Sequence, residues 1–279
     1  MKKRTNVLIN APYTLWSVIF IVVPLLMVVY FAFTKSDGSL TFANIIALKD
    51  YWAEFRDSIL YALIATIVAL LVGYPFAYAL TKLSEKTQRI QMMLIMLPMW
   101  INFIIRTYGW KNILEYNGLI NSVLKAMNLK TVQFLGPGAV ILVMVYDYLP
   151  YMILPIYTVL SKMDPALTEA ARDLGCNGFN VWKKVVLPLS VPGVVSGITM
   201  VFVPAISTFY ISAIMTDNKV KLIGNIIEEY MKAGSVSGNV ETNFNLGAAM
   251  SLVLAILILI SIIIMNRFTD GQEEGNLVV

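Results

Sequence analysis

Residues that commonly perform catalysis or bind metals are scarce in this chain. It contains no histidine, which excludes acid–base and metal chemistry that depends on imidazole. Cys176 is the single cysteine, so neither an intrachain disulfide nor a cysteine cluster can form. The Gly-x-x-x-x-Gly-Lys-[Ser/Thr] and Gly-x-Gly-x-x-Gly patterns are also missing. We therefore predict no catalytic residue, no metal site and no ATP site of the common kind.

A polar loop from Ser161 to Pro188 separates two long apolar segments. Asp164 can cap a helix, because its carboxylate accepts hydrogen bonds from the free N–H groups of a first turn. Pro165 suits the first helical position, where no N–H bond is lost. Gly175 suits the left-handed residue that ends a helix. Together these signals predict a short helix over 165–174.

The predicted helix has two different sides. Small and apolar residues fall on one side and polar residues on the other: Ala166, Leu167, Ala170, Ala171 and Leu174 against Thr168, Glu169, Arg172 and Asp173. After a turn at Asn177-Gly178, a second short helix is expected to end at Pro188. The apolar side needs a partner, either lipid headgroups or a groove in another protein. Its small, flat Glu-Ala-Ala surface favours the protein groove.

The spacing of this loop resembles that of a known family. Glu169-Ala170-Ala171 is followed after three residues by Gly175, after nine more by Val185, and after one more by Leu187-Pro188. This pattern resembles the EAA loop of the membrane subunits of ABC importers, which has Ile in place of Val185. In that family the loop forms a coupling helix that fits a cleft of the ATPase subunit. The resemblance assigns ATPase coupling to Glu169, Ala170, Ala171, Asp173, Gly175, Leu187 and Pro188.

Stretches outside this loop resemble one branch of the family, the B-type permeases of spermidine/putrescine importers. They are Gly73-Tyr74-Pro75-Phe76-Ala77-Tyr78, Leu97-Pro98-Met99-Trp100-Ile101-Asn102, Ile105-Arg106-Thr107-Tyr108-Gly109-Trp110, Leu149-Pro150 with Leu154-Pro155-Ile156-Tyr157, Pro204 with Thr208-Phe209-Tyr210, and Ile223-Gly224-Asn225. The resemblance extends over nearly the whole chain. It implies an all-α type I importer fold, a second (C-type) permease, two copies of a cytoplasmic ATPase that binds ATP-Mg, and an extracytoplasmic polyamine-binding protein. The chain itself is expected to bind no cofactor and to be no enzyme.

If the cargo is a polyamine, its positive charges need carboxylates, carbonyls or aromatic faces along the path. Asp147 is the only acidic residue deep in a predicted membrane span. Unpaired, it would cost at least about 2.5 kcal/mol there. It either faces the path and attracts the cation, or forms a structural ion pair with Arg106. Aromatic candidates for the path are Trp100, Phe209 and Tyr210, although packing is the plainer explanation for any single one.

The amino-acid composition indicates that these residues lie in a membrane protein. Of 279 residues, 58% are hydrophobic and 14% are charged, which is typical of a polytopic membrane protein. Six apolar segments are predicted to span the lipid bilayer, at about 11–33, 59–80, 92–110, 138–160, 191–215 and 246–266. The whole chain, 1–279, is then one permease domain, with a cytoplasmic coupling loop at 161–190.

Six spans and an inner N-terminus place both termini and the coupling loop in the cytoplasm. The charge difference is small, with 11 Lys and Arg inside and 10 outside, but the short N-terminal segment and second inner loop carry three each. The net charge of +4 fits loops that face anionic lipid, so no nucleic-acid partner is expected. The predicted location is the cytoplasmic membrane of a prokaryote.

Two other functions remain open at this point. A related importer could carry ferric iron, thiosulfate or sulfate, although Asp147 argues against an anion. A membrane enzyme or secondary transporter belongs to another class. The missing histidine and the single carboxylate within the spans argue against a proton relay, and no inverted pair of broken helices is evident.

Overall fold

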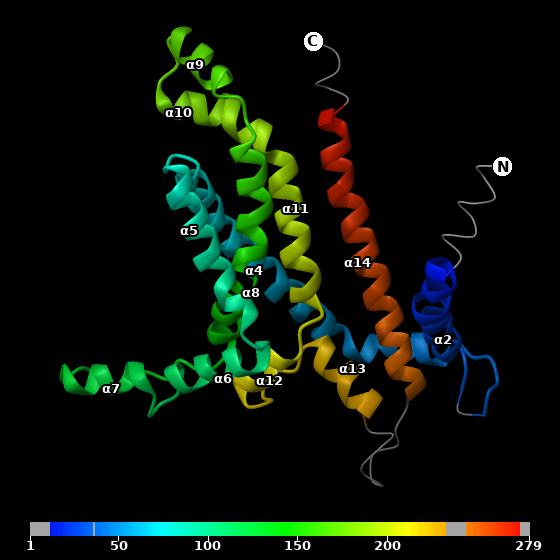
Figure 1. Ribbon diagram of the computed structural model, residues 1–279. Coiled ribbons are helices and arrows are strands. Elements are labelled where there is room, and N and C mark those ends of the chain that lie inside the picture. Colours follow the sequence, from blue (N-terminus) through cyan, green and yellow to red (C-terminus); the bar gives the residue numbers. More distant parts are fainter. Residues whose placement is uncertain (1–11, 36, 233–243, 274–279) are drawn as a thin grey trace, which may run out of the picture. The chain divides into compact units, whose positions relative to one another are not determined.

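The computed structural model describes residues 12–35, 37–232 and 244–273, with side chains up to 267. It consists of helices joined by short connections (Figure 1). In chain order these are η1 (Val18–Val22), α2 (Val23–Ala32), α3 (Ala43–Ala47), η2 (Leu48–Tyr51), α4 (Trp52–Leu80), α5 (Glu85–Met96), η3 (Leu97–Trp100), α6 (Phe103–Leu114), α7 (Leu119–Ala126), α8 (Pro137–Ser161), α9 (Pro165–Asp173), α10 (Gly178–Val181), η4 (Trp182–Val186), α11 (Leu187–Ile206), α12 (Tyr210–Thr216), α13 (Ile223–Lys232) and α14 (Phe244–Glu273).

Helices long and apolar enough to cross a membrane cover most of the predicted spans. Within the described residues there are five, and up to six if one bent pair counts as a span. The five are Pro12–Ala32, Ala43–Leu80, Pro137–Ser161, Gly178–Ile206 and Phe244–Arg267. The all-α fold is confirmed, and the chain is a multi-pass membrane protein.

The predicted span over 92–110 is formed by two helical segments rather than one continuous helix. Helical segments Glu85–Trp100 and Phe103–Ala126 meet there at an angle of 93°. Pro98 cannot donate a backbone hydrogen bond, and the segment around it tightens into the 3₁₀ turn η3. Asn102 then starts α6, because its Oδ1 accepts from the backbone N–H of Ile104 at 2.9 Å. The chain therefore breaks at residues 101–102.

The predicted span over 191–215 is also divided. Helix α11 ends at Ile206, and α12 begins at Tyr210 after a three-residue break. At the other end of α11, the predicted stop at Pro188 is wrong, since α10, η4 and α11 run on as one helix from 178 to 206. The π turn η4 ends at Val186, two residues before Pro188, and this wider turn accommodates a residue that lacks an N–H donor.

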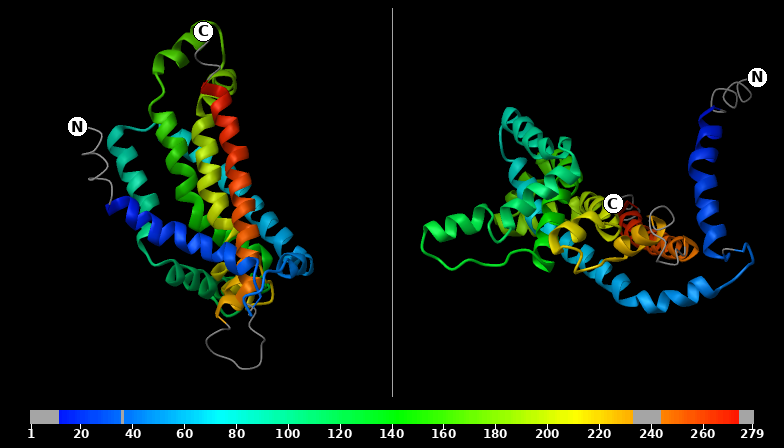
Figure 2. Two further views of the ribbon diagram at one scale, coloured as in Figure 1. Left: turned by 90° about the vertical axis from the view of Figure 1, so that its right-hand side faces the viewer. Right: turned by 90° about the horizontal axis from the view of Figure 1, so that it is seen from below.

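The chain divides into two compact units: Met1–Glu54 with Ile226–Leu257, and Phe55–Asn225 with Ile258–Val279. In the second unit, α8 and α11 run side by side (Figures 1 and 2). Gly193 and Gly197 allow this approach, because a Cβ at Gly193 would lie 2.9 Å from the Pro155 carbonyl oxygen and one at Gly197 would lie 2.8 Å from the Met152 sulfur. Small residues at this spacing are how membrane helices come close.

The first unit is held by two buried amides. Asn44 Nδ2 donates to the Ala32 and Thr34 carbonyls at 3.1 and 2.9 Å. Asn245 Nδ2 donates to the same Thr34 carbonyl at 2.6 Å and to that of Phe31 at 3.1 Å. The last carbonyls of a helix lack the N–H donors of a following helical turn, and these side chains supply donors at the end of α2.

Candidate functional site

Helix α9 is shaped by its own sequence, as predicted. Asp164 caps its start, with Oδ1 accepting from Ala166 N at 2.9 Å. At its end, Gly175 N donates to the Arg172 carbonyl at 2.8 Å and Cys176 N donates to the Ala171 carbonyl at 3.1 Å. These two bonds form a Schellman motif around Gly175, whose φ is +85°. Asn177, predicted in a turn, caps α10 by accepting from Asn180 N at 2.9 Å.

The apolar side of α9 is left largely uncovered. Of the five residues predicted on that side, Ala171 alone is buried, where α9 meets α10 and η4. Leu174 is 87% exposed and Leu167 is 46% exposed, and Phe179 at the start of α10 is 65% exposed. Glu169, Ala170 and Asp173 are exposed as well. This segment, 161–190, therefore offers both apolar and acidic groups for docking.

The coupling segment, residues 161–190, is attached firmly to the long helices beside it. Leu187 is half-buried and Pro188 is exposed at the start of α11. Ser190 on the same helix lies 2.9 Å from the Tyr74 hydroxyl of α4. The Tyr157 hydroxyl of α8 donates to Gln88 of α5 at 2.6 Å. The first contact links the segment to α4, and the second links α8 to α5 beside it.

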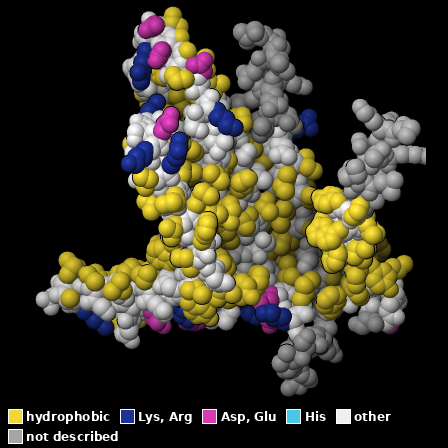
Figure 3. All heavy atoms as spheres, in the orientation of Figure 1, with side chains coloured by type: hydrophobic (Ala, Val, Ile, Leu, Met, Phe, Trp, Pro, Cys, Tyr) yellow, Lys and Arg dark blue, Asp and Glu magenta, His cyan; other side chains and the backbone are white. Residues whose placement is uncertain are grey.

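The surface changes from charged over the coupling segment to apolar along the neighbouring helix α5. Figure 3 shows Lys, Arg, Asp and Glu gathered over α9, α10 and the start of α5, whereas hydrophobic side chains cover the visible face along the rest of α5. A polar cavity of about 190 Å³ lies between the segment and the ends of α4 and α5. It is lined by Tyr78, Thr81, Lys82, Gln88, Leu160, Ser161, Met163, Asp164, Pro165, Thr168 and Val186.

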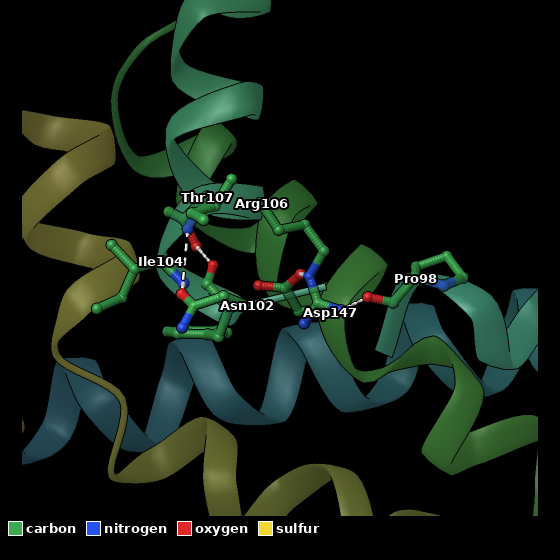
Figure 4. A network of polar contacts seen from close by, with 8 residues as sticks. Pro98, Asn102, Ile104, Arg106, Thr107 and Asp147 are labelled. Atoms are coloured by element: carbon green, nitrogen blue, oxygen red, sulfur yellow. Dashed lines mark hydrogen bonds and ion pairs between the residues drawn. The ribbon is translucent and has the colours of Figure 1, made fainter. Parts of the chain in front are cut away.

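At the break between η3 and α6, Asp147 pairs with Arg106. Arg106 extends from α6 between Asp147 on α8 and Pro98 of η3 (Figure 4). Its Nε lies 2.5 Å from Asp147 Oδ1, and its Nη1 donates to the Pro98 carbonyl at 2.7 Å. The Asp147 side chain is fully buried, and that of Arg106 is 11% exposed. The ion pair considered as an alternative for Asp147 is therefore present.

Trp100 lies on the outside of the same break. It is 88% exposed and borders an apolar groove of about 550 Å³ along α5 and η3. The other lining residues are Arg89, Met92, Met93, Met96 and Leu97. Trp100 thus lies at the surface of this break, whereas Asp147 of α8 contacts it from the interior through Arg106.

The second break, at 207–209, carries the other two aromatic candidates. The ring centroids of Phe209 and Tyr210 are 4.2 Å apart with a tilt of 35° between the ring planes, and both residues are half-buried. Asn225 holds this break: its Nδ2 donates to the Phe209 carbonyl at 2.8 Å, and its Oδ1 accepts from Leu222 N at 2.9 Å. The Ser212 hydroxyl lies 2.6 Å from the same Oδ1. The sequence pattern gave no role to Asn225, since its partners lie up to 16 residues away.

A further ion pair joins α6 to the end of α12. Lys111 Nζ lies 2.7 Å from Asp217 Oδ1, and the two side chains are 23% and 57% exposed. The hydrogen bond from Lys111 holds the pKa of the Asp217 carboxyl below its usual value. Among the described residues, no group of three His, Cys, Asp or Glu side chains is placed to hold a metal ion.

The chain has relatives of known type. Residues 69–274 match the family model described as "Binding-protein-dependent transport system inner membrane component". The "Spermidine/putrescine transport system permease protein PotB" of Haemophilus influenzae is 36% identical over 264 residues, which is 90% of each chain. The protein of the same description from Escherichia coli K12 is 35% identical over 253 residues, 86% of this chain and 92% of the relative.

Solved structures show the fold. A chain of a bacterial ABC transporter involved in the import of the acidic polysaccharide alginate superposes with a TM-score of 0.77 at 13% identity. The match covers 97% of this chain and 99% of that one. A chain of the MetNI methionine ABC transporter gives a TM-score of 0.55 at 16% identity and covers 78% of this chain and 94% of that one.

Proposed function

This chain belongs to the family of binding-protein-dependent transport system inner membrane components, and we propose that it forms half of the membrane path of an ATP-driven importer of polyamines such as spermidine and putrescine. The relatives described as spermidine/putrescine permeases, at 35–36% identity over nearly the whole chain, support this cargo. The main structural support for the importer mechanism is the exposed segment around α9, because a separate ATPase could bind to its surface.

In this mechanism the coupling segment receives the motion of the ATPase. Leu167, Leu174 and Phe179 supply exposed apolar area, and Glu169 and Asp173 supply charge around it. The helix running from α10 through α11 carries a displacement toward the break at 207–209. The two copies of the ATPase bind ATP-Mg and perform the hydrolysis, so this chain transmits work without catalysing a reaction.

The remaining partners follow from the open surfaces and the cargo. A second, C-type permease provides the other half of the path, and an extracytoplasmic polyamine-binding protein delivers the cation. The coupling segment lies on the cytoplasmic side together with both termini. The groove beside Trp100 and the Phe209–Tyr210 pair provide aromatic faces, to which an ammonium group is attracted.

The test is transport by the complete complex in reconstituted vesicles. The chain is co-expressed with its genomic neighbours, and uptake of radiolabelled spermidine is measured with ATP, without ATP, and with an excess of unlabelled putrescine. We expect uptake only with ATP, and competition by putrescine. A complex that hydrolyses ATP with its binding protein but takes up no polyamine would overturn the cargo. Uptake of ferric iron, thiosulfate or sulfate in its place would identify the other cargo.

A further inference from the structure

The Arg106 guanidinium is surrounded by the groups that proteins use to bind organic cations. Asp147 supplies a carboxylate oxygen at 2.5 Å and Pro98 supplies a carbonyl oxygen at 2.7 Å. The rings of Phe103 and Tyr146 also lie near it, with centroids 6.0 and 5.9 Å from Cζ. Carboxylate, carbonyl and two aromatic faces are also what a primary ammonium group requires. We call these four groups the cation cage.

The carboxylate in this cage is poorly satisfied by Arg106. Its two oxygens can accept about four hydrogen bonds. Although Arg106 Nε is close to Oδ1, neither Oδ1 nor Oδ2 has a hydrogen-bond partner of good geometry among the described residues. A fully buried carboxylate with unmet hydrogen-bond acceptors lowers the stability that a structural ion pair could provide. A smaller cation with three freely rotating donors would fit these acceptors better.

The cage also lies at a point where the chain changes direction. Pro98 is in η3 and Arg106 is in α6, on opposite sides of the 93° break, and Asp147 is on α8. Arg106 therefore ties η3 to α8 through one side chain (Figure 4). A cation that replaced the guanidinium would release this tie. Occupancy of the cage and the geometry of the break are thus linked.

We propose that the cation cage is a binding subsite for an alkylammonium group, and that Arg106 is its resting occupant, which the ammonium group of the cargo displaces. The nature of the cargo rests on the proposed function, whereas the chemistry of the cage does not. Arg106 then acts as an internal competitor, and a cargo cation gains access to Asp147 only when Arg106 swings away.

The first test asks whether the cage binds an ammonium group. In the purified complete complex, Arg106→Ala is titrated with n-butylammonium, and the thermal midpoint is followed by tryptophan fluorescence. We expect a saturable rise of the midpoint. Butan-1-ol, which has nearly the same shape without the charge, should give none. Arg56→Ala, which removes an arginine from the exposed pair with Asp57, is the matched control and should not respond either.

Removal of the acceptor should abolish this binding. In Arg106→Ala/Asp147→Asn, n-butylammonium should leave the midpoint unchanged. If Arg106→Ala does not assemble, Arg106→Gln takes its place, because it keeps a polar side chain at this position without the charge. Equal stabilisation of the single and double variants, or the absence of any stabilisation in both arginine variants, would overturn the cage.

The second test asks whether Arg106 competes with the cargo. Since Arg106→Gln removes the resident cation, it should lower the KM for spermidine uptake, by roughly tenfold if the arginine occupies the cage in nine complexes of ten. Arg106→Lys keeps a resident cation and should stay near the wild-type KM. An unchanged or raised KM in Arg106→Gln would contradict the exchange. Wild-type complex without polyamine uptake would refute the proposed cargo instead, and the n-butylammonium titration would still decide the cage.

Discussion

The coupling segment and the two helix breaks interrupt the long helices in different ways. In the coupling segment, the bonds that start and end α9 join residues two to five positions apart: Asp164 Oδ1 accepts from Ala166 N, and the Ala171 carbonyl accepts from Cys176 N. At the breaks, the decisive bonds join distant residues. Arg106 reaches Asp147 on another helix, and Asn225 reaches Phe209.

The conformation of the coupling segment is therefore set by its own residues, whereas the conformation of each break depends on neighbouring helices. The coupling segment is specified locally, so it can present a constant surface to a partner while the helices behind it move. The breaks are held by side chains from other helices, so any shift between those helices changes them. Under the proposed function, a locally specified docking surface is thus connected to helix breaks whose geometry depends on neighbouring helices.

Removing one member of the buried pair should have the largest effect on stability. Asp147→Leu leaves the Arg106 guanidinium without its carboxylate, and loss of one partner of a buried pair costs about 3–5 kcal/mol. Arg106→Met/Asp147→Leu should recover most of this loss, because both charges are gone. Thermal midpoints of the purified complexes would measure both changes. A double variant as unstable as the single one would show that the pair is not the cause.

At the second break, Asn225→Ala should destabilise less. The Phe209 carbonyl and Leu222 N–H lose their partner, and unsatisfied buried groups cost about 1–3 kcal/mol. Hydrogen exchange should accelerate around residues 207–212 and remain unchanged in α9. The local counterpart is Asn177→Ala, which removes the cap of α10 and should accelerate exchange only there. Faster exchange in α9 after Asn225→Ala would contradict the separation of the two regions.

Within the coupling segment, Gly175→Ala tests whether the end of α9 is determined by the backbone conformation of this one residue. Space is not limiting there, since a Cβ would meet nothing within 4 Å, but φ of +85° is unfavourable for alanine by about 1 kcal/mol. We expect faster exchange at the end of α9 and weaker uptake. Gly178→Ala has equal space and no positive φ, so it is the matched control and should behave as wild type. Equal effects of the two variants would refute the conformational argument.

The exposed pair of Lys111 and Asp217 should give the smallest effect. Because its pKa is lowered in the folded chain, the Asp217 carboxylate stabilises the fold above its usual pKa, and this contribution disappears as the pH falls through the lowered value. Asp217→Asn should therefore have a slightly lower thermal midpoint than wild type at pH 7. The difference should persist at pH 5, start to shrink as the pH falls below about 4, and vanish only below the lowered pKa of Asp217. A difference that grows toward low pH would have the wrong sign.

Local signals explain which features could be predicted from the sequence. Asp164, Pro165 and Gly175 act within a few residues, so the bounds of α9 follow from residue type and spacing. The division of the spans near Pro98 and Pro204 could not be derived in this way. Proline alone allows either a kink or a break. The outcome depends on the local cap by Asn102 and on the contacts of Arg106 with Asp147 and of Asn225 with Phe209, which are distant in sequence. The spacing of Gly193 and Gly197 was a readable signal for helix contact that the span prediction did not use.

The most direct test of the central claim is to measure uptake and ATP hydrolysis together in the same vesicles for Glu169→Lys. If the exposed surface of α9 passes the work of the ATPase to the membrane helices, spermidine uptake and its stimulation of ATP hydrolysis should both be lost, while the chain still inserts and assembles with its partner permease. Glu85→Lys makes the same charge change at an exposed position on α5 and should leave both activities intact. Wild-type uptake and stimulation in Glu169→Lys would contradict the account.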